Sequence, residues 1–332
     1  MSKTRLSRRQ FVSTAALGAA AIPGAAGTMM QGTAGSRFAS LPEAKPRKFY
    51  NVLSLGRLGL HADFPESVRL AVKHGFEGVD PDPEYFAGLS DSEMAKTLDD
   101  LKSKNLKLGD AGLPVEFRKD EAEFNDGLKT LPAAAQVLHR AGVERVTTWI
   151  LSSDDDLTYL QNFRLHACRL RACARVLADH GLRLGLEYVG PRTSWRSKRH
   201  PFVHTMSEVK ELIVAIGADN LAIQLDSYHW YNAEESAADI ETLRNRDVAT
   251  VDLNDAPAGL TRDQLEDLSR ELPAATGVIP VKEFLTALAS IGYDGPIHAE
   301  PFSKSLAAMP IDDACAASAA AMKKAFALAG LA

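Results

Sequence analysis

The 332-residue sequence predicts an α/β fold, a single closed (β/α)8 barrel, and three observations support this prediction. First, one sequence pattern recurs from Lys45 onward: an amphipathic stretch, a glycine, two or three residues and a short apolar run. Second, eight such runs can be counted, the number that a closed parallel barrel needs. Third, the turn from Leu55 to Gly59 does not match G-x-G-x-x-G, the pattern expected after the first strand of an open dinucleotide-binding sheet.

The predicted strands are short and apolar, as buried parallel strands usually are. They are expected near residues 48–53, 77–80, 106–110, 145–149, 182–187, 221–226, 248–253 and 296–300. The segments between them have helical spacing, and the apolar residues from Leu160 to Leu177 step by three and four. Ser152 to Asp156 offer caps and negative charge for the start of that helix, and a C-terminal helix is expected around 311–328. We therefore expect one catalytic barrel domain over residues 46–332.

Residues 1–40 are predicted to be an export signal and flexible leader outside the barrel. The string Ser7-Arg8-Arg9-Gln10-Phe11-Val12 opens an apolar stretch that runs to Ile22 and is followed by small residues. This string resembles a twin-arginine signal, which implies the twin-arginine export machinery as a partner and a periplasmic or otherwise exported protein. A stretch this short cannot cross a bilayer, which takes about twenty apolar residues, so no stable membrane anchor is expected.

Charge and cysteine content exclude several classes of protein. The formal charge is −5, and loss of the five cations in residues 1–40 would make it −10. Nonspecific nucleic-acid binding needs a cationic surface, so we expect no nucleic-acid partner. Three cysteines cannot make a disulfide framework, and Cys168, Cys173 and Cys315 are interpreted as small core residues.

Carboxylates end six of the eight predicted strands, at the edge where barrel enzymes place their chemistry. Four of them end successive strands: Glu187, Asp226, Asp252 and Glu300. A carboxylate buried without a partner costs several kcal/mol, so acids that converge on one barrel mouth need a cation. Oxygen ligands favour one divalent metal, Mn²⁺ or Mg²⁺, with Zn²⁺ or Co²⁺ as alternatives.

The individual acids differ in their local context. Asp80 and Asp110 are interpreted as helix caps or solvated loop residues, the commoner role of a single acid at a strand end. Glu187 and Glu300 have largely apolar neighbours, which is a poor setting for mere solvation. For these two we favour a functional role.

Four segments resemble the xylose-isomerase-like barrels, the superfamily of sugar phosphate isomerases and epimerases. They are 185–190 (GLEYVG), 225–231 (LDSYHWY), 251–257 (VDLNDAP) and 297–302 (IHAEPF). Residues 270–277 are similar to the Arg-x-x-Pro…Gly segment of that family. The resemblance covers about residues 46 to 330 and implies a metal-dependent barrel that acts on a small-molecule sugar or polyol. Members often form homo-oligomers.

The resemblance also implies roles for single residues. In ketose epimerases of this family a Glu, an Asp, a His and a second Glu bind one metal, and Glu187, Asp226 and Glu300 match three of them. Asp252 stands where the family usually has His, so either its oxygen is the fourth ligand or the metal affinity or the reaction has changed. Substrate-binding roles are implied for His229 and Arg270; the alternatives are a buried His and a surface Arg. Trp149 is considered for a substrate-binding role because it ends the fourth predicted strand, and the alternative is a core Trp.

The resulting hypothesis is a sugar isomerase or epimerase that acts on a ketose-like substrate through an enediolate. Glu187 and Glu300 would be its acid/base pair. The first alternative is a metal-dependent lyase or dehydratase acting on a keto-sugar or inosose. A second is a catalytically lapsed sugar-binding barrel. A phosphodiesterase resembling endonuclease IV would need several His ligands and a cationic surface, which the composition disfavours.

Overall fold

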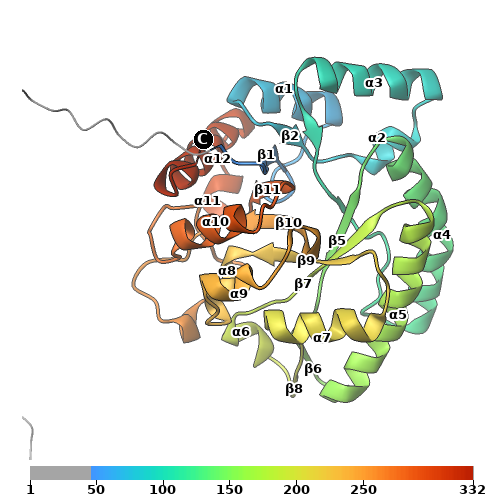
Figure 1. Ribbon diagram of the computed structural model, residues 1–332, viewed down its shortest axis with the longest axis vertical. Helices are drawn as coiled ribbons and strands as arrows, with labels where there is room; N and C mark the ends of the chain where they lie inside the picture. The colour runs from blue at the N-terminus through green and yellow to red at the C-terminus, as the bar shows by residue number, and fades with distance from the viewer. Residues whose placement is uncertain (1–45, 332) are drawn as a thin grey trace, which may run out of the picture. The chain divides into compact units, whose positions relative to one another are not determined.

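The computed structural model describes residues 46–331, which form a (β/α)8 barrel of the predicted kind (Figure 1). Its parallel strands are β1 (Tyr50–Leu53), β2 (Gly78–Val79), β3 (Lys107–Leu108), β4 (Ala111–Gly112), β5 (Arg145–Trp149), β7 (Arg183–Glu187), β9 (Leu221–Asp226), β10 (Val248–Leu253) and β11 (Pro296–Ala299). The sheet order is β3-β2-β1-β11-β10-β9-β7-β5-β4. Only Gly109 and Asp110 separate β3 from β4, which pair with β2 and β5 at the two ends of this order, so the sheet closes into a barrel.

All eight predicted strands are present, but the third is interrupted. Gly109 lies at the interruption, where a Cβ would come 2.2 Å from Oδ1 of Asp80 and 3.1 Å from Nε2 of His298. A side chain at this position would therefore displace the two groups that meet there.

The helices surround the sheet, as the repeated pattern predicts (Figure 1). They are α1 (Phe64–His74), α2 (Pro83–Ala87), α3 (Asp91–Ser103), α4 (Glu121–Arg140), α5 (Tyr159–Asp179), α6 (Arg192–Trp195), α7 (Met206–Ile216), α8 (Ser227–Asn232), α9 (Ala237–Glu241), α10 (Val281–Ser290), α11 (Lys304–Ala307) and α12 (Ile311–Leu328), with 3-10 turns η1 (Asn245–Asp247) and η2 (Arg262–Gln264). The repeated glycines end helices in the left-handed conformation, for example Gly75 with φ 74° and Gly217 with φ 65°.

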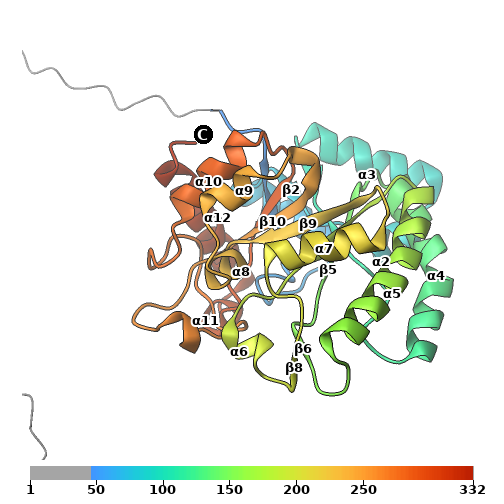
Figure 2. The ribbon, with the colours of Figure 1, turned by 60° about the horizontal axis from the view of Figure 1, so that its bottom comes forward.

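Short elements follow the carboxyl ends of the strands. Figure 2 shows α6, α8 and α11 on the same side of the barrel as the antiparallel pair β6 (Ser153–Asp154) and β8 (His200–Pro201). The predicted cap of the long helix was wrong, because Ser153 and Asp154 form β6 and Thr158 is the N-cap of α5. Ser152 and Ser153 instead line one of the cavities at this end of the barrel.

The structure also bears on the predicted burial of the cysteines and on the search for membrane-spanning segments. Cys173 and Cys315 are buried, but Cys168 is exposed on α5, so its assignment to the core was wrong. Within residues 46–331, no helix has both the length and the hydropathy of a membrane-spanning segment. The predicted export signal at residues 1–40 and the domain boundary after it lie outside the described residues and stay predictions.

Candidate active site and metal centre

Four carboxylates meet at the carboxyl ends of the last four barrel strands; we call them the acid cluster. They are Glu187 at the end of β7, Asp226 at the end of β9, Asp252 in β10 and Glu300 directly after β11. Each offers an oxygen, and these four oxygens lie within 4.8 Å of one another. All four residues are buried. The fold thus gathers the acids that the strand-end pattern singled out into a space that one small ion can share.

Glu187 has one oxygen for which residues 46–331 supply no hydrogen-bond partner. Its Oε1 is buried and accepts no hydrogen bond from the described residues. His229 Nε2, 3.6 Å away, is the imidazole nitrogen that faces it. The Gly190 amide donates to His229 Nδ1 at 3.3 Å, and a Cβ on Gly190 would come 2.4 Å from the His229 carbonyl oxygen. A close approach that only glycine permits therefore fixes the imidazole beside Glu187.

Asp226 has a structural role as well as its place in the cluster. Its Oδ1 accepts from the amides of Tyr228 and His229 and so caps α8. Arg270 Nη1 donates to Asp226 Oδ2 and to Glu300 Oε2, at 2.8 Å in each case. The Arg270 side chain is only 1% exposed and holds these two acids together, so it is not the surface arginine that was weighed as an alternative.

Asp252 is held by a residue that the sequence analysis did not select. Arg57, in the loop after β1, places Nε 2.8 Å from Asp252 Oδ1, although this contact falls outside hydrogen-bond geometry. Gln224 donates from Nε2 to the other oxygen, Oδ2, at 2.7 Å. Arg57 Nε also lies 3.9 Å from Glu300 Oε1. The only sequence feature near Arg57 is a turn without a recognised motif, so local pattern gave no signal.

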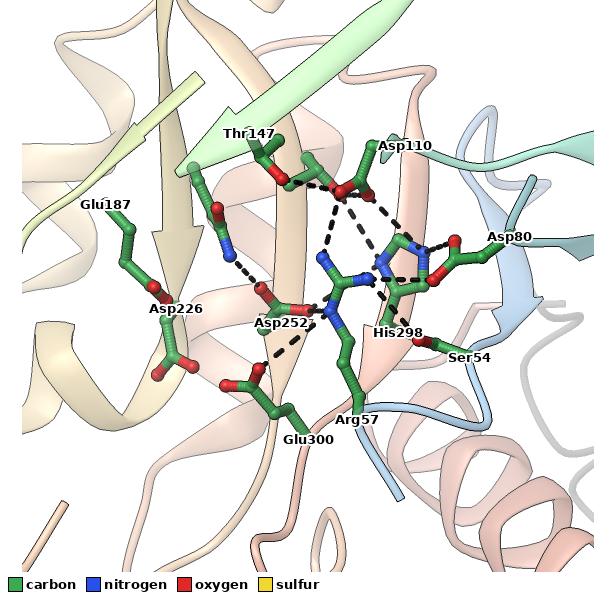
Figure 3. Close-up of polar contacts among 12 residues, drawn as sticks. Ser54, Arg57, Asp80, Asp110, Thr147, Glu187, Asp226, Asp252, His298 and Glu300 are labelled. Atoms are coloured by element: carbon green, nitrogen blue, oxygen red, sulfur yellow. Dashed lines mark hydrogen bonds and ion pairs between the residues drawn. The ribbon is translucent and has the colours of Figure 1, made fainter. Parts of the chain in front are cut away.

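The rest of the Arg57 guanidinium joins two acids from the first half of the barrel (Figure 3). Nη1 donates to Asp80 at 2.9 Å and Nη2 to Asp110 at 3.0 Å. The imidazole of His298 contacts Asp80 Oδ1 at 2.9 Å and Thr250 Oγ1 at 3.3 Å. We call Arg57, Asp80, Asp110 and His298 the arginine network.

The arginine network corrects the interpretation of Asp80 and Asp110 as caps or solvated residues. Asp110 is 4% exposed and accepts from the hydroxyls of Thr147 at 2.7 Å and Thr250 at 2.9 Å. Asp80 is only partly exposed and is bound by Arg57 and His298. Both acids therefore serve to anchor a guanidinium whose side chain is 14% exposed against the acid cluster.

The pKa values of Glu187 and Glu300 in the acid cluster and of Asp110 in the arginine network are shifted in opposite directions. Burial and the charges of Glu300, Asp226 and Asp252 raise the pKa of Glu187 well above its usual range. Burial and the charge of Asp252 do the same to the pKa of Glu300, against the opposing effect of Arg270. Burial also raises the pKa of Asp110, but the charges of Arg57 and His298 outweigh it and leave that pKa below its usual range. Negative charge is thus compensated in the network and under-compensated in the cluster.

The acid cluster fits a divalent cation on charge and geometry. Its four carboxylates carry −4 when ionised, and Arg57 and Arg270 are the arginines paired with them. Both arginines also pair with acids outside the cluster, so at least two negative charges remain for a divalent ion to compensate. The unpartnered Glu187 Oε1 points into this space, and the donors are all oxygen, which suits a hard cation. The residues that would hold the ion are Glu187, Asp226, Asp252 and Glu300.

Two cavities, of about 530 and 830 Å³, open on the cluster from either side and share Trp149, Glu187 and Glu300 as lining residues. Trp149, at the end of β5, is 44% exposed and is therefore not a core residue. Another cavity, of about 750 Å³, lies around the strand starts Tyr50 and Arg145, at the other end of the barrel and away from this chemistry.

The fold and the site together define an enzyme built on a (β/α)8 barrel, with a buried cluster of four carboxylates as its candidate site for a divalent metal. Residues 68–325 match the protein family described as "Xylose isomerase-like TIM barrel", and the chain belongs to this family. Inosose isomerase of Bacillus velezensis is 23% identical over 256 residues, 73% of this chain and 84% of that protein. With several inosose isomerases among its relatives, the chain is an isomerase of the xylose isomerase-like kind.

Solved structures show the same fold. A xylose isomerase domain protein from Alicyclobacillus acidocaldarius superposes with a TM-score of 0.72 at 29% identity, over 85% of this chain and 99% of that one. The IolI protein, solved with a binding zinc atom, has a TM-score of 0.69 at 17% identity, over 84% of this chain and 98% of that one. The likeness to the IolI protein concerns the fold alone.

Proposed function

We propose that this protein is a divalent-metal-dependent sugar isomerase or epimerase that works through an enediolate. The observation that carries the proposal is the unpartnered, buried Oε1 of Glu187, which faces the same cleft as Glu300 inside the acid cluster. The inosose isomerases among its relatives support a sugar or polyol substrate.

Glu187 and Glu300 are the two groups that would move the proton. One carboxylate takes the proton from the carbon next to the substrate carbonyl. The electrons of the broken C–H bond form the enediolate double bond, and the carbonyl π electrons move onto the carbonyl oxygen. The other carboxyl returns a proton, to the same carbon from the opposite face in epimerisation or to the neighbouring carbon in isomerisation. A bound divalent metal supplies Lewis-acid stabilisation of the negative charge that develops on the two substrate oxygens.

Neighbouring residues would prepare these two acids. Arg270 donates to Glu300 Oε2, so Glu300 Oε1, which among the described residues has only the longer contact with Arg57 at 3.9 Å, is the oxygen that would face substrate. Burial lowers the pKa of His229, which keeps the imidazole neutral beside Glu187. Trp149 and His229 line the cavity and remain our candidates for substrate contact, and Arg270 acts mainly by positioning the acids.

Proton exchange in heavy water tests the proposal. With metal-loaded protein and an inosose or ketohexose, we expect deuterium to enter the substrate. Glu187→Gln and Glu300→Gln should each reduce incorporation by at least about 100-fold, the range of a general acid or base. Glu211→Gln, on α7 outside the cleft, is the control. Full exchange in both site variants would remove the proposed roles, and a product lighter by one water would assign elimination instead.

We also propose that residues 1–40 direct the protein through twin-arginine export to the periplasm. The support is the Arg8-Arg9 pair ahead of a short apolar stretch. Replacement of both arginines by lysine should leave the protein in the cytoplasm, as fractionation and immunoblotting would show. Unchanged export of that variant would overturn this assignment.

A further inference from the structure

The cleft around the acid cluster has two unlike halves. The 830 Å³ cavity, here the acidic lobe, is lined among others by Arg57, Asp80, Asp82, Glu84, Asp110 and Gln224. The 530 Å³ cavity is here called the apolar lobe after its side chains Leu151, Val189, Leu268 and Phe302. Polar residues line it as well, namely four serines, Thr193, Lys198, His229, Asp267 and Arg270. Because the lobes share Trp149, Glu187 and Glu300, the reacting groups stand at their junction rather than at the end of a single pocket.

Each lobe alone is large enough for a ligand unit. Cavities that bury a whole drug-sized molecule measure about 300–1,000 Å³, and both lobes fall within that range. A substrate of one sugar ring at the acid cluster would leave much of one lobe filled with water. The size and arrangement of the cleft therefore favour a ligand with two units, one on each side of Glu187 and Glu300.

The apolar lobe presents apolar side chains to solvent. Leu268 is 69% exposed and Trp149 is 44% exposed. The Arg118 guanidinium lies 4.2 Å from the Trp149 ring centroid and is fixed by its hydrogen bond to Thr148 Oγ1 at 2.9 Å. The indole is thus backed by a fixed cation and prepared to stack on the apolar face of a ring.

Phe302 adds strained backbone to the same lobe. Its φ of 39° lies in the left-handed region, which costs a non-glycine residue about 1–3 kcal/mol. Its ring packs against Arg270, whose guanidinium carbon lies 4.6 Å from the centroid. This conformation places the Phe302 ring, two residues after Glu300 in the sequence, in the apolar lobe, where a second ligand unit would lie.

The charge of the cleft argues against a phosphorylated ligand. Six acids line the acidic lobe: Asp80, Asp82, Glu84, Asp110, Glu187 and Glu300. Arg57, the arginine among its lining residues, is already paired with three carboxylates. In the apolar lobe Arg270 is likewise paired, which leaves Lys198 to face Asp267 and the acid pair. Asp82 and Glu84, which pair with no cation among the described residues, would repel a phosphate from the acidic lobe.

We infer that the substrate is an uncharged compound of two units, a keto-sugar that carries a glycosidically linked second unit. The hydroxyl-rich keto-sugar lies at the acid cluster and in the acidic lobe, and the second unit packs on Trp149, Leu268 and Phe302. This inference rests on the proposed function, because the keto group is placed by the chemistry assigned to Glu187 and Glu300.

The test compares one-unit, two-unit and phosphorylated probes on the manganese-loaded full chain. Fructose, lactulose, isomaltulose and fructose 6-phosphate are assayed for deuterium incorporation and, by calorimetry, for binding. We expect at least one disaccharide to exceed fructose about tenfold in kcat/KM and in affinity, and fructose 6-phosphate to be weakest. Equal values for fructose and both disaccharides, or a preference for the phosphate, would overturn the inference.

A matched pair of variants locates the second unit. Leu268→Ala should lower disaccharide affinity about tenfold and fructose affinity by less, whereas Leu160→Ala removes another exposed leucine, from α5, without effect. Identical behaviour of the two variants would contradict the placement. Incorporation into fructose without a disaccharide preference refutes only this inference. Tighter disaccharide binding without any incorporation refutes only the proposed function.

Discussion

Arg57 Nε lies 2.8 Å from Asp252 Oδ1, and this ion pair joins the loop after β1 to the end of β10 across the barrel mouth. The same guanidinium reaches Asp80 and Asp110. One side chain therefore compensates three carboxylates from three strands, and it brings a permanent positive charge to the edge of the acid cluster. That charge is the physical reason why an aspartate can stand at position 252 beside three other acids.

The first prediction concerns this pair. Arg57→Gln leaves Asp110 and Asp252 buried without their cation, which should lower the free energy of unfolding by about 3–5 kcal/mol. Asp252→Asn in the same chain should restore part of that loss. Urea unfolding of both single variants and the double variant gives the coupling energy, expected at about 0.5–3 kcal/mol. Strictly additive losses would show that the pair is not coupled.

Metal binding should depend on pH. Burial and neighbouring charge raise the pKa values of Glu187 and Glu300, so these groups hold protons that an arriving cation must displace. Affinity for Mn²⁺ should therefore rise as pH increases above about 4.5, the ordinary range of Glu. Calorimetry in two buffers of different ionisation enthalpy should detect proton release. Affinity that stays constant from pH 5.5 to 8, with no protons released, would contradict the under-compensated charge of the cluster.

Glu235 predicts a separate effect of pH on stability. Burial raises its pKa to about 7, although its oxygens accept from Tyr188 Oη at 2.5 Å and the Met206 amide at 2.6 Å. Because the folded-state pKa is above the unfolded value, the contribution is complete below about pH 4.5 and is lost as pH rises through 7.

The check is urea unfolding at pH 4.5 and pH 8. The stability of the natural chain relative to Glu235→Gln should fall by up to about 3 kcal/mol between these pH values. Glu241→Gln, exposed on α9, is the matched control. A pH-independent difference between the natural chain and Glu235→Gln would show that Glu235 titrates normally.

Gly190 should be intolerant of a methyl group. A Cβ there would lie 2.4 Å from the His229 carbonyl oxygen, so Gly190→Ala must push α8 and the imidazole away from Glu187. We expect a loss of about 1–3 kcal/mol in the free energy of unfolding. Gly112→Ala, where a Cβ meets nothing within 4 Å, should change it little. Equal stability of the two variants would mean that the close approach is not maintained in solution.

The barrel and the positions of the four acids follow from local sequence pattern, because helix-ending glycines, short apolar runs and strand-end carboxylates can each be recognised within a few consecutive residues. The arginine network does not follow from local sequence pattern. Arg57 sits in an unremarkable turn, and its partners Asp80, Asp110 and Asp252 come from three other strand ends, so only the closed barrel brings them together. The break at Gly109, which makes room for His298, also depends on that closure.

The most direct test of the central claim is a crystal structure of the manganese-soaked protein with anomalous data at the manganese absorption edge. We predict one strong peak enclosed by oxygens of Glu187, Asp226, Asp252 and Glu300. A peak between Asp80, Asp110 and His298 instead, or no peak at the acid cluster at saturating Mn²⁺, would contradict it.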